Sequence, residues 1–462
     1  MKFTLLLKNE NDSSEPVIVS EIERTGPLNA ASLGLTIAES KCLLANIQKE
    51  LVESQLQCFL QEQRICARCG TRRTLKDYHT ACFKSLFGGA NLRVPRFNGC
   101  PCEGLHTRAQ TVKIDGLANW VSPELEFIQS KMAAMIPYAR TADLLDLLLP
   151  VASGNAPSTV RRRALNIGQR LDAELHEAAD ATHIECPKAV KNPVTVVGLD
   201  SGYVRDCRPH SEGSFEVVVG RILNENKDSR SLGFVRTIEI NTAARHRLKQ
   251  RLCEQGQITD NITVFTDGDS GLRCLLMSAL PKATHILDWY HLTRPLTVLK
   301  RVLFGKEAIK QFPTYYHDPL CKHLESLKWR LWHGYVGGAF NRIRAILFRL
   351  RLPTIAGKQV AVRMRRLIKE LLRYLKNNQD SLANYGRRYR SGRRISTAFV
   401  ESAVNQLIDK RMSKSQQMRW SPIGAHALLQ VRAEVVDDRL GAAFSRWYPG
   451  FAGQSKSLQV AA

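Results

Sequence analysis

Two aspartates accompany apolar runs that predict β-strands, one within its run and one at the end, and their carboxylates are strong candidates for chemistry. Asp200 lies in VVGLDSGYV between small residues, and Asp267 directly follows the run ITVFT. An ionised carboxylate is costly to bury in a strand unless a cation compensates it. Strand ends are also where open α/β sheets bind ligands. We therefore expect the two side chains to meet at one site.

A further acid, Asp269, follows closely in the stretch TDGDSGL and competes with Asp267 for the same role. Asp is a frequent N-cap, and the stretch SGLRCLLMSAL predicts a helix that begins directly after Asp269. Asp-Gly and Asp-Ser are also common turn pairs, so a plain turn is the alternative for both acids. We favour Asp267 because it immediately follows the strand, with Asp269 as its rival.

Glu401, in AFVESAVNQLIDKRM, is the candidate for a third carboxylate. Its helix would pack across the sheet through four apolar residues at helical spacing, which are Val400, Val404, Leu407 and Ile408. Glu401 and Asn405 would then share the adjoining face, one turn apart. The alternative is an exposed glutamate that pairs with a basic neighbour.

Carboxylates that converge in this way would form a site for hard divalent cations. We expect two Mg²⁺ or Mn²⁺ ions, which keep positions open for water and for substrate phosphates. Such a pair can activate an attacking oxygen and stabilise a leaving one in phosphoryl transfer. Asp288 and His291 lie in the stretch DWYH at the end of another strand. This stretch is one of the motifs that carry the family resemblance given below, which implies that the two residues support the site or contact DNA; a structural role for His291 is equally open.

Cysteines form a second set of candidate ligands. They occur as a Cys-x-x-Cys pair and a Cys-x-Cys pair separated by 30 residues: Cys66, Cys69, Cys100 and Cys102. A hairpin in SLFGGANLRVPRF would bring the pairs together as a four-thiolate site for one structural Zn²⁺. Unligated thiols are the alternative, and His79 or Cys82 could replace one of the four ligands.

The charge of the chain narrows the class of its partner. The 462 residues include 67 Lys and Arg against 43 Asp and Glu, a formal net charge of +24 with a pI near 9.7. This excess favours a polyanion, with nucleic acid ahead of a membrane surface. No apolar run has the length of a bilayer span, and the apolar part of MKFTLLLKNENDSS is too short for a signal peptide. We therefore expect an intracellular protein without a membrane segment, in which the 12 cysteines are thiols or metal ligands.

The sequence predicts a modular chain with an α/β domain interrupted by helices. In order, the expected regions are a helical region (1–60), a zinc ribbon (61–110), a helix-turn-helix-like region (111–187), the first part of the α/β core (188–291), an all-helical insertion (292–395), the last helices of the core (396–445) and a tail (446–462). The core would have the order β-β-β-α-β-α-β. Residues 291–395 hold 24 Lys and Arg against 5 Asp and Glu, a net charge of +19.

The stretch YARTADLLDLLLPVASGNAPSTVRRRALNIGQRL predicts a helix, a turn and a basic helix capped by Ser158 or Thr159. In a helix-turn-helix, three arginines at the start of the second helix would face phosphates or bases: Arg161, Arg162 and Arg163. A helical hairpin with a solvated basic end is an equally open alternative.

This order of elements resembles the RNase H-like DDE transposases of bacterial insertion sequences. The motifs DWYH, FVESAVNQLIDKRM and MRWSPIGAHALLQVRA, together with the zinc ribbon before FGGANLRVPRF, are similar to the ISKra group and more distantly to Mutator-like enzymes. The likeness covers roughly residues 60–440. It implies an RNase H-like mixed sheet interrupted by the large helical insertion and preceded by the zinc ribbon and helical DNA-binding modules.

The resemblance also implies a function. Asp200, Asp267 and Glu401 would be the catalytic acids of a transposase that hydrolyses the phosphodiester at an element end and then joins the freed 3′-hydroxyl to target DNA. Its partner would be double-stranded DNA, bound by a homodimer or a larger synaptic assembly at the nucleoid in the bacterial cytoplasm. Arg419 and Trp420 of the MRW motif would contact DNA near a cleaved end, or else pack at a helix start.

Two other functions fit the same residues. One is an RNase H-like nuclease or resolvase, which cuts structured nucleic acid without joining. The other is a domesticated DNA-binding protein without catalysis, although the presence of all three candidate acids counts against it.

Overall fold

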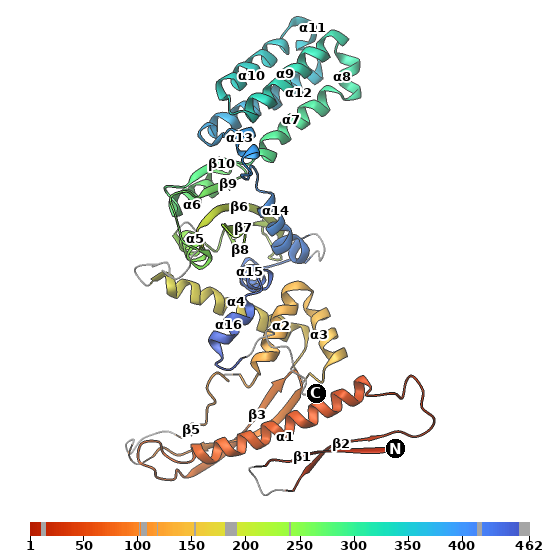
Figure 1. The fold of residues 1–462 in the computed structure, drawn as a ribbon, viewed down its shortest axis with the longest axis vertical. Coiled ribbons are helices and arrows are strands. Elements are labelled where there is room, and N and C mark those ends of the chain that lie inside the picture. Colours follow the sequence, from red (N-terminus) through yellow and green to blue (C-terminus); the bar gives the residue numbers. More distant parts are fainter. Residues whose placement is uncertain are drawn as a thin grey trace. The chain divides into compact units, whose positions relative to one another are not determined.

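The computed structural model describes residues 1–10, 15–100, 102, 109–117, 119–151, 154–180, 192–239, 242–413 and 418–451 (Figure 1). The chain divides into two compact units. The first comprises Met1–Leu171 and Asp438–Ala462, and the second comprises Asp172–Asp437. Helices accompany sheets in both units, which confirms the mixed α/β class expected from the sequence.

The first unit begins with an antiparallel hairpin of β1 (Lys2–Leu7) and β2 (Val17–Glu23). Helix α1 (Ile37–Gln63) follows, with Thr36 and Glu39 as its capping box. The expectation that residues 1–60 are helical is therefore wrong for their first part. The stretch VIVSEIE is rich in β-branched residues, which favour a strand. Pairing in a hairpin gives each of the two short strands a partner for its backbone hydrogen bonds.

Helix α1 shares one core with the sheet that follows it. Strands β3 (Leu75–Ser85), β4 (Gly88–Phe97) and β5 (Gln110–Thr111) pair antiparallel in that order. Leu56 of α1 is buried with Leu92 and Val94 of β4. The predicted boundary at residue 60 therefore does not separate two cores. The hairpin is also longer than predicted, because it begins ten residues before Ser85.

Four helices complete this unit. They are α2 (Pro123–Met135), α3 (Tyr138–Leu148), the first part of α4 (Pro157–Asp180), and α16 (Leu440–Trp447). Phe127 of α2 meets Phe444 of α16 edge to face, with ring centroids 5.3 Å apart. Helix α4 starts at Pro157, so Ser158 and Thr159 lie within its first turn and neither is the predicted cap.

A mixed five-stranded sheet forms the centre of the second unit, with the spatial order β10-β9-β6-β7-β8. Its strands are β6 (Val194–Arg205), β7 (Ser214–Asn224), β8 (Ser229–Val235), β9 (Thr263–Thr266) and β10 (Thr284–Leu287). Strands β6, β9 and β10 run parallel, whereas β7 and β8 add antiparallel. The element order matches the expected β-β-β-α-β-α-β.

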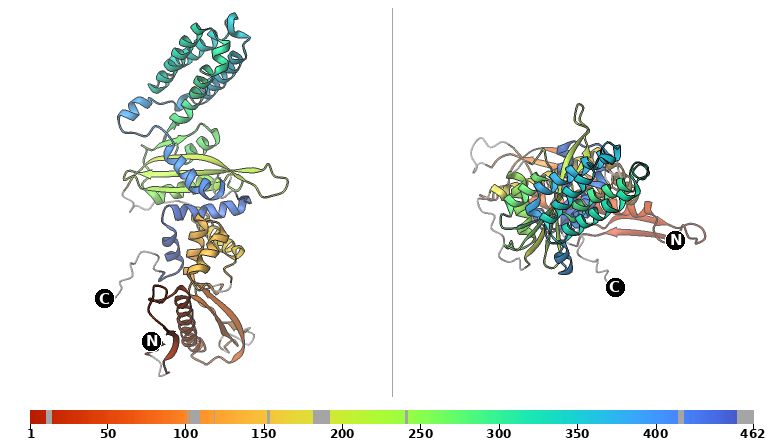
Figure 2. Two further views of the ribbon diagram at one scale, coloured as in Figure 1. Left: turned by 90° about the vertical axis from the view of Figure 1, so that its right-hand side faces the viewer. Right: turned by 90° about the horizontal axis from the view of Figure 1, so that it is seen from above.

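Helices cover both faces of this sheet (Figure 1). Helices α5 (Thr242–Gln255) and α6 (Ser270–Ala279) pack on one face, where Val197 and Leu199 of β6 lie. Helix α14 (Ala398–Val404) crosses the other face, as Figure 2 shows. It continues as a wider π-helical segment, η3 (Asn405–Ser413).

Residues between β10 and α14 form the expected helical insertion. Its elements are α7 (Trp289–Leu303), α8 (Lys306–Gln311), α9 (Thr314–Trp332), α10 (Val336–Arg349), α11 (Pro353–Ala356), α12 (Gln359–Asn377), the short η2 (Gln379–Ser381) and α13 (Tyr385–Arg390). The apolar faces of these helices form one core that extends to Phe265 and Leu287 of the sheet and to Val400 of α14.

The last helix of this unit, α15 (Pro422–Val436), lies against β8 and η3. The sequence predicts an amphipathic helix here, but residues 422 and 424–434 are all buried. Small and apolar residues allow contact on several sides, and its buried polar groups are satisfied internally. Gln430, for example, donates to the carbonyl oxygen of Gly233 at 3.0 Å. Among all helices of the described residues, none is long and apolar enough to cross a membrane.

Candidate functional site

Asp200 and Asp267 lie at the same level on adjacent parallel strands. Gly198 of β6 pairs with Phe265 of β9; Asp200 lies two residues further along β6, and Asp267 lies two residues after Phe265, directly beyond the end of β9. Side chains two residues apart point to the same face of a sheet, so Asp200 shares the face of Gly198. The register therefore places the two acids side by side at the carboxyl end of the parallel strands.

Two glycines allow α14 and η3 to approach this face closely. A Cβ atom on Gly198 would lie 2.3 Å from Cγ2 of Val400, and one on Gly202 would lie 3.0 Å from Cδ1 of Ile408. Because these glycines flank Asp200 on its own face, the helix that contacts both passes directly beside this acid. The small residues around Asp200 thus create the space for the helix that carries Glu401.

The three acids line one pocket of about 620 Å³. The other residues of its wall are Ser201, Tyr203, Glu216, Asp269, Tyr290, His291 and Arg294. Asp200 is half-buried and accepts a hydrogen bond from the backbone N–H of Ser201 at 2.8 Å. Burial raises the pKa of Asp200, and the negative charges of Asp267 and Glu401 raise it further. A compensating cation would relieve this repulsion.

Asp269 has the capping role that the sequence offered as its alternative. Its Oδ1 accepts from the N–H of Leu272 at 2.8 Å and caps α6. Its own N–H donates to Oδ1 of Asp267 at 3.0 Å. The hydroxyl of Tyr374, in the insertion, donates to the carbonyl oxygen of Asp267 at 2.7 Å. Asp267 is therefore fixed from two sides at the strand end.

Asp288 is fully buried and joins two helix starts. Its Oδ1 accepts from the backbone N–H groups of Tyr290 and His291, which caps α7. Its Oδ2 accepts from the N–H of Thr397 at 2.8 Å and from the Thr397 hydroxyl, at the start of α14. Because both oxygens are occupied, Asp288 has a positioning role in this site.

His291 and Glu401 lie close together as a result. Nε2 of His291 is 3.9 Å from Oε1 of Glu401, whose side chain is 53% exposed. Ligand atoms of Asp288, His291 and Glu401 lie within 4.8 Å of one another. With the Asp288 oxygens engaged, the groups of this trio that face the pocket are His291 and Glu401.

Some pocket residues were not found from the sequence, and Asn405 lies outside the pocket wall. Arg294 lies one helical turn after His291, so helical spacing could have suggested it. Glu216 is found only through register, because it pairs with Tyr203 on β6. Asn405 is exposed and is not part of the pocket wall, although its backbone N–H bonds to the carbonyl oxygen of Glu401 one turn before it.

The predicted DNA-contacting residues differ in accessibility. Arg163 is buried and donates to Oε1 of Gln129 at 2.7 Å, whereas Arg161 and Arg162 are exposed. The buried Arg163 thus links α4 to α2 and does not face solvent.

Trp420 is also buried, whereas Arg419 is exposed. The backbone N–H of Trp420 donates to the carbonyl oxygen of Arg205 at 2.9 Å, and the Arg411 guanidinium lies 5.0 Å from its ring centroid. Packing, the alternative that the sequence left open for Trp420, is the role that the structure shows.

The four predicted cysteines come together in the first unit. Their sulfur atoms lie within 4.8 Å of one another, with 3.6 Å between Cys66 and Cys102 and 3.2 Å between Cys69 and Cys100. A tetrahedral Zn²⁺ site has sulfurs about 3.8 Å apart, given bonds of about 2.3 Å. Backbone N–H groups of Cys69 and Arg68 lower the pKa of Cys66 to about 6. The cluster could therefore hold Zn²⁺, and neither His79 nor Cys82 belongs to it.

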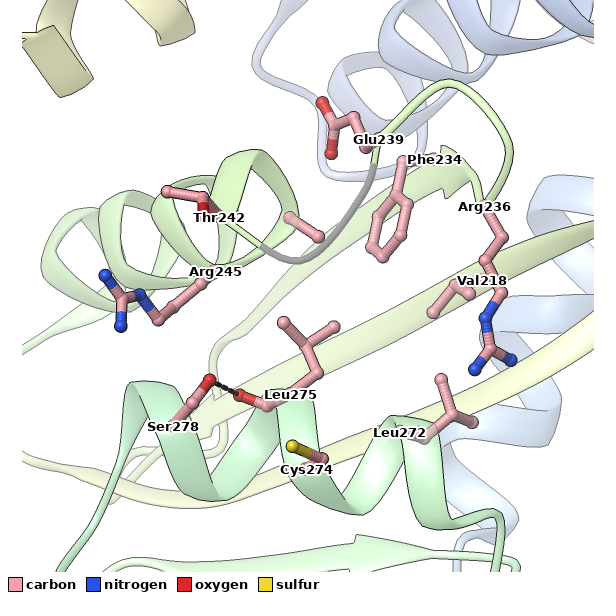
Figure 3. A pocket seen from close by; sticks show the side chains of 12 residues that line it. Val218, Phe234, Arg236, Glu239, Thr242, Arg245, Leu272, Cys274, Leu275 and Ser278 are labelled. Carbon is pink, nitrogen blue, oxygen red and sulfur yellow. Dashed lines mark hydrogen bonds between the residues drawn. The ribbon is translucent and has the colours of Figure 1, made fainter.

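A further pocket of about 410 Å³ lies between α5 and α6 (Figure 3). Apolar side chains such as Val218 and Phe234 contribute to its wall. Arg236 also lines it, and its Nη1 pairs with Oε1 of Glu216 at 2.9 Å. Since Glu216 lines the carboxylate pocket, this ion pair connects the two pockets.

Comparison of the chain with protein-family models and with curated proteins gave no match in either case. The geometry of the carboxylate pocket is therefore the basis on which a function can be assigned.

Proposed function

We propose that this protein is a DNA transposase of an insertion sequence, which cleaves and joins DNA strands by a DDE mechanism. The observation that carries the proposal is the convergence of Asp200, Asp267 and Glu401 on one pocket from three distant parts of the chain. The strand order β10-β9-β6-β7-β8, with three antiparallel strands followed by two parallel ones, is the arrangement expected of an RNase H-like sheet.

The residues of the pocket fit hard divalent cations. Carboxylate oxygens are the ligands that Mg²⁺ and Mn²⁺ prefer. Burial raises the pKa of Asp200, and the negative charges of Asp267 and Glu401 contribute to the same shift. Asp200, Asp267 and Glu401 would hold the ions. When bound, a pair of such ions would activate the attacking oxygen and stabilise the leaving oxygen of a phosphodiester.

The protein itself supplies the positions of these groups. Rigid strands fix Asp200 and Asp267, and Asp288 sets the start of the helix that carries Glu401. Arg294 lines the same pocket and offers a cation to a substrate phosphate. Because the pocket is open and its wall is mainly polar, it suits a segment of a charged polymer better than an apolar small molecule.

The remaining parts of the chain support DNA as that polymer. The insertion region carries a net charge of +19, and a duplex presents one phosphate charge per roughly 1.7 Å of its axis. We assign recognition of the element ends to the first unit, with its cysteine cluster and with Arg161 and Arg162 on the exposed side of α4. A homodimer or larger synaptic assembly would bring two ends together.

A cleavage and joining assay tests the proposal. Purified protein is incubated with DNA from the flanks of its own gene and with Mg²⁺ or Mn²⁺. Glu401→Gln is compared with Glu370→Gln, because the two glutamates are 53% and 55% exposed but Glu370 lies on α12 outside the pocket. We expect joined products from the wild type and from Glu370→Gln, and a loss of about 10³-fold or more in Glu401→Gln.

Each other outcome selects a rival function. Cut products without joined strands would identify a nuclease or resolvase. Salt-sensitive DNA binding without products in any of the three proteins would identify a non-catalytic DNA-binding protein.

A further inference from the structure

An arginine-rich segment of the insertion, residues 387–394 (RRYRSGRR), carries charges with which no carboxylate of the described residues forms an ion pair. Its five arginines are Arg387, Arg388, Arg390, Arg393 and Arg394. Four of them are exposed and Arg388 is half-buried. Within the described residues none of the five forms an ion pair. Burial lowers the pKa of Arg388, and the neighbouring charge of Arg393 lowers it further.

Two buried arginines elsewhere in the same unit form ion pairs with carboxylates. Arg230 is buried and pairs with Glu434 at 2.6 Å and with Asp437 at 3.1 Å. Arg247 is buried and pairs with Glu239 and Asp172. In these two cases the charge of a buried arginine is compensated by carboxylates inside the unit. Four of the five arginines of residues 387–394 are exposed instead, where an external anion can reach them.

The segment is held in place at both of its ends. The hydroxyl of the fully buried Tyr385 donates to the carbonyl oxygen of Leu287 at 2.9 Å. On the other side, the N–H of Trp289 donates to the carbonyl oxygen of Ile395 at 3.1 Å. Both anchors lie next to Asp288, at the point where the insertion leaves the sheet. Fixed ends reduce the entropy that is lost when the arginines bind a ligand.

The segment lines two adjoining pockets, of about 560 Å³ and about 1010 Å³, which share Thr284, Arg388 and Arg393. The larger one also contains Thr195 and Thr263, which stand at the amino ends of the parallel strands. Together the pockets form a groove at the end of the sheet opposite the carboxylates. Besides the arginines, its charged wall residues are Lys227, Asp380 and Glu225, so basic groups predominate.

We propose that this groove binds the sugar–phosphate backbone of DNA, an assignment that rests on the proposed function for the choice of DNA as the polymer. Guanidinium groups bind phosphate oxygens in pairs of hydrogen bonds. Tyr389 lines the groove, is 66% exposed and offers a ring on which a sugar or base can stack. Strand β9 has four residues, a length of about 13 Å, which equals about four base pairs of duplex. One DNA molecule is therefore long enough to contact both the groove and the carboxylate pocket.

The test compares two variants with the same change in charge. The groove variant carries Arg387→Gln, Arg393→Gln and Arg394→Gln, all at exposed positions. The control carries Arg363→Gln, Lys369→Gln and Arg373→Gln, which are exposed on α12 and lie outside both pockets. Binding of the full-length proteins to a fluorescent duplex is measured over a range of salt concentrations, with a melting curve for each protein.

We expect the groove variant to bind more than about tenfold more weakly than the control near 0.15 M salt, and the slope of log K against log salt to fall by about 3. Equal losses in the two variants, or an unchanged slope in the groove variant, would overturn the proposal, as would absence of DNA binding by the wild type. Glu401→Gln keeps the groove intact and should bind as the wild type does. If cleavage is absent throughout but binding depends on the groove, the proposed catalysis fails while the groove stands.

Discussion

The cysteine cluster and the carboxylate pocket both bring candidate metal ligands together, but the chain assembles them in different ways. The cysteines come as two pairs with one or two residues inside each pair, at the ends of the elements around a hairpin. The carboxylates come from β6, from the end of β9 and from α14, and two glycines are needed for α14 to come near. In the first case the ligands are local, whereas in the second the whole sheet is required.

The two sites should therefore differ in how far the surrounding fold depends on a bound metal. Four thiolates that crowd together repel one another, so a cation bound by the cluster would stabilise this part of the fold. The carboxylate pocket is held by strand pairing and by the buried Asp288, so the fold exists before an ion is bound. A metal should therefore stabilise the first unit strongly and serve mainly chemistry in the second.

Loss of one thiol should have the largest effect. Cys66→Ser removes a buried ligand from a type of site in which the metal contributes on the order of 10 kcal/mol to folding. We expect loss of bound zinc and an early melting transition, and addition of a chelator to the wild type should reproduce both. Zinc content per chain and a melting curve provide the measurement. Cys82→Ser is the control, because Cys82 is exposed on β3 and lies outside the cluster; an equal loss there would contradict the assigned ligands.

Removal of the buried carboxylate of Asp288 should have the second-largest effect on stability. Asp288→Ala leaves the start of α7 and the N–H and hydroxyl of Thr397 without their acceptor, a cost of roughly 3 kcal/mol. Cleavage should fall as well, since His291 and Glu401 lose their alignment. Asp269→Ala, which removes the cap of α6 at a side chain 40% exposed, should cost only about 1 kcal/mol. If it abolishes cleavage while Asp267→Asn does not, Asp269 is the second catalytic acid.

A methyl group between β6 and α14 should have a smaller effect on stability. The added Cβ of Gly198→Ala would overlap Val400 and Phe399, at 2.3 Å and 2.8 Å, and we expect a loss of roughly 2 kcal/mol together with weaker cleavage. In Gly337→Ala the new methyl meets open space at the start of α10, so stability should be unchanged or slightly higher. Chemical denaturation of both variants would show whether the pocket depends on the closeness of this helix.

The smallest expected effect is a pH dependence from His285, which joins β9 and β10 below the carboxylates. Its ring bonds to Thr266 at 3.0 Å and to Ser381 at 2.7 Å, and burial lowers its pKa to about 4. The unfolded chain binds a proton near pH 6.5 while the folded chain does not, so stability is full above that pH and falls as the pH drops toward 4. Between pH 7 and 5.5 the loss should be about 1 kcal/mol. It should disappear in His285→Gln and persist in the exposed His210→Gln.

The sequence was informative where a residue's role depends on its immediate neighbours. The spacing of the cysteine pairs, the apolar strands that carry Asp200 and Asp267, and the helical periodicity around Glu401 are all local patterns, and the structure brings these residues together as expected. It also gives Asp269 the capping position that its place before a helix suggested.

The sequence was less informative where burial depends on distant partners. Arg163 and Trp420 look like surface residues in a basic or aromatic motif, yet both are covered by tertiary packing. From Asn405 on, the helix takes a π form that no residue type predicts. The shared core of α1 and β4 likewise removes a boundary that composition suggested.

The junction at Asp288 and Thr397 also determines how the second unit should unfold. The chain leaves the sheet at one of these residues and returns at the other, and the hydrogen bonds between them close the insertion into a loop of the kind that tolerates domain insertion. The core does not follow this division, because Phe265 and Leu287 of the sheet are buried together with the helices of the insertion. Heating should therefore melt the sheet and the insertion in one cooperative transition. The path of the chain alone would instead suggest that the insertion could be removed as a separate piece.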